Sequence, residues 1–233
     1  MHKGFTLAEV LITLGIIGIV SAMTIPNLIS KHNKRTIETR LFKIHSTILQ
    51  GIRMAQANSD SNFNLDNLAQ DTTTSTSSFS WEKSRAVFEE YFSPVFKVVH
   101  RYPKGTQFRV YSADGSTEVG QIDYNSYIVT LTDGTTIGFV KAGNSERFYI
   151  DVILNPNRKK LISGRDTFFM LYDTDGFGNF SFKTLGAYHK ENYKKYCASH
   201  EARPAAAIYP SYFCTTLIFK NNFKIPDDYP VKL

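Results

Sequence analysis

The sequence predicts an α+β protein in which one long N-terminal helix packs against an antiparallel β-sheet. The chain begins with an apolar run, residues 5–25, in which Glu9 is the only charged residue. Apolar residues then recur at the helical period, and beyond Thr106 the pattern changes to short β-branched or aromatic runs separated by turns. We therefore divide the chain into a short N-terminal segment, an apolar helical half, an amphipathic helical half and a globular head, at residues 1–4, 5–25, 26–57 and 58–233.

The composition fits a folded chain whose head is almost neutral. The 233 residues are 42% hydrophobic and 14% aromatic, which excludes a disordered protein, and 14 Gly with 8 Pro exclude a collagenous one. The net charge of +6 is local: residues 31–53 carry six cations and one acid, whereas 20 cations and 19 acids follow from Met54 onward. A nearly neutral head does not indicate a nucleic-acid-binding surface.

The apolar run is long enough to cross a membrane. As a helix rising ~1.5 Å per residue it spans roughly 30 Å, the thickness of the hydrocarbon layer. A secretory signal is the alternative, but its apolar region is shorter, carries no acid and ends in a small-residue cleavage site. The residues near Ala22 form a poor cleavage site, and the pattern continues through Pro26 into more helix. We therefore expect a membrane-spanning helical half.

Glu9 needs a counter-charge, because a carboxylate within the apolar layer costs on the order of 2.5 kcal/mol or more unless it reaches an interface or a partner. A place near the helix end, from which the side chain reaches the interface, is one solution. Cleavage after Gly4 is another, since it creates an α-amine on Phe5, four residues before Glu9. That amine can pair with Glu9 within one chain or between neighbouring chains.

The segment Gly4-Phe5-Thr6-Leu7-Ala8-Glu9 and the basic leader before it resemble the processing signal of type IV prepilins and type II secretion pseudopilins. The resemblance implies cleavage after Gly4 and N-methylation of Phe5 by a prepilin peptidase. It also implies a pilin-like fold, with a long bent N-terminal helix on an antiparallel head. Assembly through this helix would involve other pilin or pseudopilin subunits and an inner-membrane assembly platform.

Gly18 and Pro26 weaken the apolar half of the helix. Pro26 cannot donate a hydrogen bond to the carbonyl of Ala22, and Gly18 lowers the helix propensity by ~1 kcal/mol relative to Ala. We expect the segment between them to bend or melt. Many pilins carry helix-weakening residues at these places, and in that family the segment is stretched when subunits pack into a filament. A harmless kink in a lone anchor is the alternative.

Beyond Pro26 the helix is amphipathic, with an apolar stripe that repeats every three or four residues. The stripe consists of Ile37, Leu41, Ile44, Ile48, Ile52 and Ala55. The cations that lie largely off the stripe are Lys34, Arg35, Arg40, Lys43 and Arg53. Cations directly after the span favour a cytoplasmic head by the positive-inside rule. The resemblance places the head in the periplasm, and we follow the resemblance.

The head is expected to begin with a polar connection, residues 58–80, and a second helix within 81–99 that is interrupted or ends near Pro94. Strands are expected at residues 108–111, 127–131, 136–140, 148–153, 167–172 and 179–182. Asp-Gly pairs at 114–115, 133–134 and 175–176 mark tight turns. The runs LTDGTTIGF, IDVILNPNRKKLISGRD and KIPDDYP resemble head segments of bacterial pilin-like proteins.

Four residues near one loop are candidate calcium ligands. Asp151, Asn155, Asn157 and Asp166 supply the oxygen ligands that calcium prefers, and some pseudopilin heads hold calcium. The alternative, which we favour, is that these residues shape and cap a turn. No other cofactor is indicated.

Cys197 and Cys214 are the two cysteines of the chain. Together with His200 they supply too few ligands for a closed metal site, which needs four, so we expect a disulfide. Closing this loop is worth ~3 kcal/mol in the chain-entropy model. In pilins such a loop is surface-exposed and recognises partners, which makes residues 198–210 the contact surface that the resemblance implies.

No catalytic motif is recognisable, since the sequence lacks Gly-x-Ser-x-Gly, a phosphate-binding loop and His-Glu-x-x-His. We therefore expect a structural subunit, a minor pilin or pseudopilin of a type IV pilus or type II secretion pseudopilus. One alternative is a single-pass anchored periplasmic binding protein that does not polymerise, and another is a DNA-uptake pilin. The expected partners are the prepilin peptidase and N-methyltransferase, other subunits, the inner-membrane assembly platform and membrane lipid.

Overall fold

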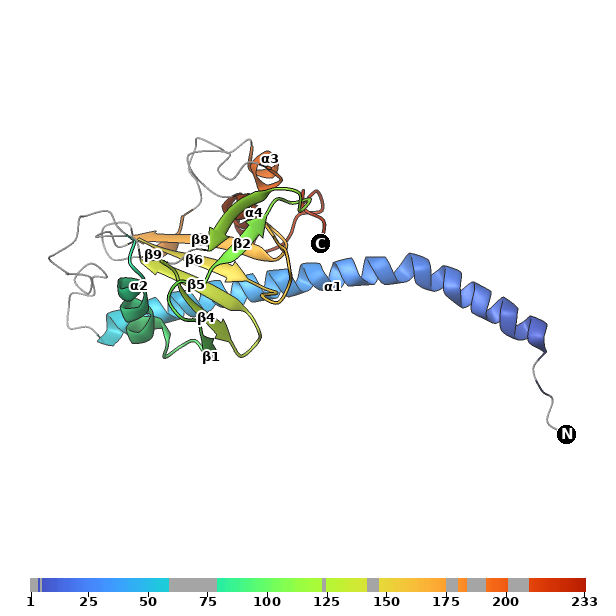
Figure 1. Ribbon diagram of the computed structural model, residues 1–233, viewed down its shortest axis with the longest axis horizontal. Coiled ribbons are helices and arrows are strands. Elements are labelled where there is room, and N and C mark those ends of the chain that lie inside the picture. Colours follow the sequence, from blue (N-terminus) through green and yellow to red (C-terminus); the bar gives the residue numbers. More distant parts are fainter. Residues whose placement is uncertain are drawn as a thin grey trace.

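One helix, α1 (Leu7–Asn58), sets the shape of the molecule. Its N-terminal half projects into solvent and its C-terminal half lies along the head (Figure 1). The computed structural model describes residues 4, 6–58, 79–122, 125–141, 147–174, 180–183, 192–200 and 210–233. The α+β, pilin-like fold expected from the sequence is confirmed.

The helix α1 is continuous through Gly18 and Pro26, so the segment between these residues has not melted. Figure 1 shows the helix curving along its projecting half. The loss of one backbone hydrogen bond at Pro26 is thus accommodated within the helix, as kinks at proline usually are.

The predicted apolar stripe is the face that α1 buries. All of its members are at most 6% exposed: Ile37, Leu41, Ile44, Ile48, Ile52 and Ala55. All of them except Ala55 belong to one core cluster with aromatic residues of the head, among them Phe88, Phe92 and Phe139. At Gly51 the helix approaches the head so closely that an added Cβ would lie 2.9 Å from Cδ1 of Phe92. The stripe therefore fixes α1 to the head along several turns.

The second helical segment is shorter than the sequence suggested. Helix α2 (Trp81–Val87) is capped at its N-terminus by Ser80, whose side chain accepts a hydrogen bond from the backbone N–H of Lys83. It continues as a π-helical turn, η2 (Phe88–Phe92), and ends before Pro94, as expected. The chain then forms a strand, β1 (Val98–Arg101), that the sequence analysis did not predict.

The main sheet has six strands in the order β1-β4-β5-β6-β8-β9, all antiparallel to their neighbours. The five strands after β1 are β4 (Tyr127–Leu131), β5 (Thr136–Lys141), β6 (Phe148–Ile153), β8 (Thr167–Thr174) and β9 (Phe180–Phe182). The predicted strands correspond to these elements within two residues at each end. Gly134 in the turn between β4 and β5 has φ +78°, which explains why this turn carries an Asp-Gly pair.

A second sheet has three strands in the order β3-β2-β7. Strand β2 (Phe108–Tyr111) was predicted, whereas β3 (Glu118–Ile122) and β7 (Leu161–Ile162) were not. Strand β7 pairs with β2 in parallel, a pairing that the sequence analysis did not predict. The Asp-Gly turn at 114–115 lies between β2 and β3, and the pair at 175–176 lies outside the described residues.

Two short helices, α3 (Tyr193–Cys197) and α4 (Pro210–Lys220), complete the head, and the sequence analysis missed both. The Cys197–Cys214 disulfide links them. The disulfide expected from the sequence is confirmed, and both cysteines are 0% exposed within a small core cluster with Phe213 and Val231. Residues 201–209 of the predicted contact surface lie outside the described residues.

Candidate functional site

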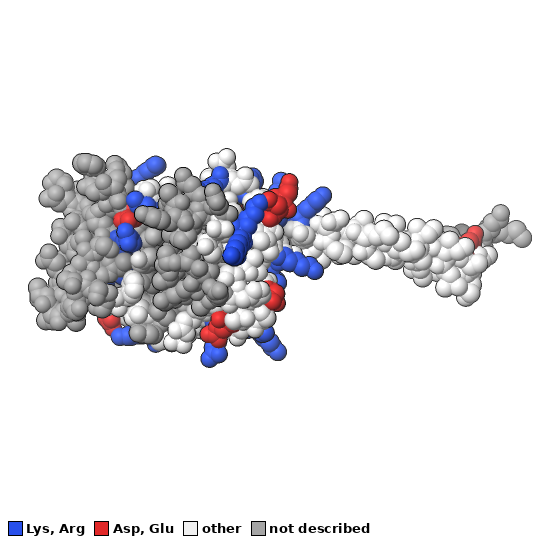
Figure 2. All heavy atoms as spheres, turned by 90° about the horizontal axis from the view of Figure 1, so that it is seen from above, with Lys and Arg blue, Asp and Glu red and all other residues white. Residues whose placement is uncertain are grey.

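The projecting half of α1 presents an apolar surface that the chain itself does not cover. From Leu7 to Ile29, the large apolar side chains are between 43% and 80% exposed. Within the described residues, α1 is the one helix long and apolar enough to cross a membrane. Figure 2 shows this rod as almost entirely uncharged, with Lys and Arg gathered where it leaves the head. The buried core helix of a soluble protein would not look like this.

The start of α1 is fixed by a reciprocal pair of hydrogen bonds between Thr6 and Glu9. The Oε2 atom of Glu9 accepts from the Thr6 backbone N–H at 2.8 Å and from its hydroxyl at 2.7 Å, and the Glu9 N–H donates back to the hydroxyl at 3.3 Å. This is a capping box, in which two otherwise unpartnered donors at a helix start are satisfied. The sequence analysis missed it, although Thr-x-x-Glu before an apolar run is its signature.

Of the two residues that flank the predicted cleavage site, the structure describes one. Gly4 is exposed ahead of the helix, and Phe5 lies outside the described residues. The predicted pairing of Glu9 with the Phe5 amine therefore remains a prediction. The Oε1 atom of Glu9 has no hydrogen-bond partner within the described part of the chain, since the Thr6 contacts use Oε2 alone.

Asp166, a candidate calcium ligand, is already paired. Its carboxylate is 0% exposed and lies 3.2 Å from the Arg158 guanidinium and 3.0 Å from that of Arg165. It also accepts hydrogen bonds from the backbone N–H of Ile162 at 3.0 Å and from the Asn155 amide at 3.4 Å. A carboxylate neutralised by two guanidinium groups is a poor ligand for a further cation. These contacts favour the turn-shaping alternative over a calcium site.

The other two candidates do not complete a metal site. Asp151 lies within β6, paired across the sheet with Phe169, and Asn157 is exposed in the turn that follows β6. Among the described residues there is no group of three or more His, Cys, Asp and Glu side chains that could hold a metal ion.

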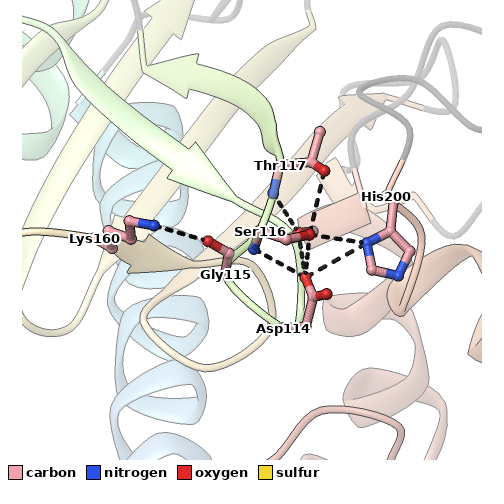
Figure 3. A network of polar contacts seen from close by, with 7 residues as sticks. Asp114, Gly115, Ser116, Thr117, Lys160 and His200 are labelled. Atoms are coloured by element: carbon pink, nitrogen blue, oxygen red, sulfur yellow. Dashed lines mark hydrogen bonds and ion pairs between the residues drawn. The ribbon is translucent and has the colours of Figure 1, made fainter.

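A polar network at the turn between β2 and β3 brings a serine, a histidine and an aspartate together (Figure 3). The Asp114 carboxylate accepts from the Ser112 and Ser116 hydroxyls at 2.7 and 2.9 Å and from the Ser116 backbone N–H at 3.0 Å. The last of these contacts is the main reason why the pKa of Asp114 is lowered. The Nδ1 atom of His200 lies 3.4 Å from Asp114 and 3.5 Å from the Ser116 hydroxyl.

This network does not have the geometry of a catalytic triad. In a triad the histidine faces the serine with one ring nitrogen and the carboxylate with the other, whereas here Nδ1 faces both. The Asp114 carboxylate also accepts its hydrogen bonds from residues of its own turn. The arrangement instead joins this turn to the segment that follows α3.

Comparison with known families covers both parts of the chain. Residues 1–25 match the prokaryotic N-terminal methylation motif, a prepilin-type signal. Residues 27–233 match the family described as "Family of unknown function (DUF6613)". The chain belongs to this family. Neither a curated protein nor a solved structure matches it. The signal and the exposed apolar helix make this DUF6613 protein a type IV pilin- or pseudopilin-like protein.

The C-terminal tail of the DUF6613 head is attached to α1 by Glu38, which the sequence analysis did not single out. Glu38 is 8% exposed, accepts from the backbone N–H of Ile225 at 2.8 Å and pairs with the Lys224 ammonium at 3.1 Å. The signal in the sequence is that Glu38 is the only acid among the cations of residues 31–53 and lies next to the apolar stripe.

A half-buried histidine, His45, lies where α1 meets the head. Its Nδ1 atom is 2.8 Å from the hydroxyl of buried Tyr172, and the two rings are stacked. Burial lowers the pKa of His45, because the charged imidazolium is poorly solvated there. Burial at this place therefore favours the neutral form of His45.

Proposed function

We propose that this protein is a filament subunit, a minor pilin or pseudopilin of a type IV pilus or type II secretion pseudopilus. The observation that carries the proposal is the division of α1 into a half fixed to the head and an apolar half that the chain leaves uncovered. An apolar surface of this length needs either a bilayer or other helices around it. A subunit that moves from membrane to filament meets both needs in turn.

In this proposal the precursor is anchored in the inner membrane with its head in the periplasm. An oxidising compartment is where the Cys197–Cys214 disulfide would form and persist. The prepilin peptidase and N-methyltransferase, the assembly platform and other subunits are the partners that the prepilin-type signal supports. Cleavage after Gly4 then makes Phe5 the first residue, with an N-methylated amine.

Glu9 would serve two partners in the filament. Its Oε2 atom caps its own helix through Thr6, while Oε1 has no partner within the described residues. The Phe5 amine of a neighbouring subunit can therefore pair with Oε1 without breaking the capping box. The pair would form in a low-dielectric surrounding, where an ion pair is stronger than in water.

The test is co-expression with a prepilin peptidase, followed by intact mass and N-terminal sequencing. The expected product begins at N-methyl-Phe5. Photo-crosslinkers at Ile12 and Ile16, both on the exposed part of α1, should then link subunits to one another. A chain that keeps Met1 to Gly4, or one that is cleaved but never crosslinks to another subunit, would leave the anchored binding protein as the better function.

Glu9→Ala is the decisive variant, with Glu118→Ala as its matched control on the head surface. Glu9→Ala should leave the protein in the membrane fraction and sharply reduce its incorporation into filaments. Glu118→Ala removes an exposed acid whose ion-pair partner within the described part of the chain is Arg109, and it should incorporate normally. Equal incorporation of the two variants would refute the role of Glu9.

A further inference from the structure

A pocket of about 430 Å³ lies at the base of the head, between α1 and the turn that follows β6. Three arginines line it, Arg40 from α1 and Arg158 and Arg165 from the head, together with His32 and Asp166. Figure 2 shows Lys and Arg side chains, with Asp and Glu beside them, around the place where the rod leaves the head. The pocket is therefore part of a cationic region next to the apolar helix.

The arginines are held in place by buried partners. Asp166, with no exposed surface, pairs with Arg158 and Arg165, and Arg40 donates one N–H to the carbonyl of Leu154 at 2.9 Å. A guanidinium group carries five N–H donors, so each arginine keeps donors beyond those used by these contacts. The lining also includes Leu233, whose terminal carboxylate adds a second negative charge to that of Asp166, so the three guanidinium groups leave the lining with an excess of one positive charge. Such an arrangement suits phosphate, which arginine binds through paired N–H groups.

The helix geometry places one end of the pocket at the level of lipid headgroups. The last large apolar side chain exposed on the rod is Ile29. At ~1.5 Å per residue, His32 lies about 5 Å and Thr36 about 10 Å further along α1. The headgroup layer on each side of a bilayer is roughly 5 to 7 Å thick. With the exposed apolar side chains through Ile29 in the hydrocarbon layer, the His32 end of the pocket meets the phosphates.

Three further cations are adjacent in sequence to residues that line the pocket. Lys31, Arg35 and Lys159 are exposed and have no ion pair within the described residues. The nearby exposed acid Asp227 is paired with Lys34 at 3.1 Å. The uncompensated charge at the base of the head is therefore positive, which complements an anionic membrane surface.

We propose that this pocket binds the phosphate of an anionic phospholipid headgroup and seats the head on the membrane surface. The proposal rests on the membrane-spanning role of α1 within the proposed function but not on filament assembly. It also accounts for the cations that follow the span in a chain whose head is placed outside the cytoplasm. Arg40 and Arg158 would bind the phosphate, while Lys31 and Lys159 would add attraction to neighbouring headgroups.

The test uses the full chain in a neutral detergent and follows lipid binding by native mass spectrometry. Dioctanoyl-phosphatidylglycerol is titrated against dioctanoyl-phosphatidylcholine, with sn-glycerol 3-phosphate as a phosphate source without acyl chains. Since one cation near anionic lipid contributes about a fivefold change in affinity, Arg40→Gln with Arg158→Gln should weaken phosphatidylglycerol binding about 25-fold. Arg40→Lys with Arg158→Lys keeps the charge without the paired donors and should fall in between.

The matched control is Arg53→Gln with Lys83→Gln, which removes exposed Arg53 and half-buried Lys83 from the far end of the head. This control should bind phosphatidylglycerol within about twofold of the parent chain, because charges beyond a Debye length of ~10 Å are screened.

If the arginine variant does not fold, Lys31→Gln with Lys159→Gln tests the same surface with exposed residues alone. That variant should weaken phosphatidylglycerol binding by a similar factor.

Three results would overturn the proposal. The first is equal affinity of the parent chain for the two lipids, and the second is an equal loss in the pocket variant and the distal control. The third is displacement of the lipid by glycerol phosphate at equal concentration, which would make the ligand a free phosphate. None of these results bears on processing after Gly4 or on crosslinking between subunits, so failure here is distinct from failure of the proposed function.

Discussion

Glu38 holds the C-terminal tail on α1, and the structure allows its two contacts to be weighed separately. The hydrogen bond from the Ile225 N–H is buried, so Glu38→Ala leaves that donor unsatisfied at a cost of about 1 to 3 kcal/mol. The Lys224 side chain is 69% exposed, and an exposed ion pair contributes at most about 1 kcal/mol. We therefore expect Glu38→Ala to lower the unfolding free energy by about 1 to 4 kcal/mol, and by more than Lys224→Ala, which should lower it by less than about 1 kcal/mol.

Glu38→Gln separates charge from hydrogen bonding, because its amide oxygen can still accept from Ile225. Glu38→Gln should therefore lower the unfolding free energy about as little as Lys224→Ala does. The assay is urea unfolding of the full chain in a neutral detergent, followed by circular dichroism. Hydrogen exchange of the tail peptide reports the Ile225 amide directly and should accelerate in Glu38→Ala alone. The reasoning is refuted if Lys224→Ala is as damaging as Glu38→Ala, or if Glu38→Gln exchanges as fast as Glu38→Ala.

Three further predictions concern the head. Replacing Cys197 and Cys214 by Ala should lower the unfolding free energy by about 3 kcal/mol, measured by urea unfolding, and a reductant should then change the parent chain but not the variant. The lowered pKa of His45 means that the unfolded chain binds the proton more readily, so stability should fall as the pH drops below 6.5; His45→Asn should lack this step in thermal unfolding. Hydrogen bonds from Arg101 lower the pKa of Glu89 from 4.5 to about 2, so the stability of this pair should be lost as the pH falls through that interval. Arg101→Gln should cost about 1 kcal/mol at neutral pH and flatten the acid limb of the profile.

The helix and the main sheet could be predicted because their patterns are local. The stripe from Ile37 to Ala55 repeats at the helical period, and each member is buried as that period requires. The hairpin of β4 and β5 follows from an Asp-Gly turn between two β-branched runs. The processing signal is similarly contained within a few residues. Each of these features is determined by neighbouring residues in one short segment, so it can be predicted from that segment alone.

The missed elements depend on residues that are distant in the sequence. Strand β7 has only two residues and exists because β2 lies beside it, which no local pattern shows. Helix α4 is buried on most sides, with Tyr212, Phe213, Cys214 and Ile218 all nearly inaccessible, so it lacks the polar face by which a surface helix is recognised. The pairing of Asp166 with Arg158 and Arg165 likewise arises from the fold of a turn.

The two halves of α1 are energetically separate. The head half packs its apolar stripe against its own chain, whereas the large apolar side chains of the projecting half are left exposed by the chain. Glu9 and Glu38 are 29 residues apart on one helix, which at ~1.5 Å per residue is about 43 Å, several times the Debye length of ~10 Å. Changes at such a distance and without shared partners contribute additively to stability. We therefore expect the head to keep its structure when the projecting half changes surroundings, as the proposed move of a folded subunit from a bilayer into a filament requires.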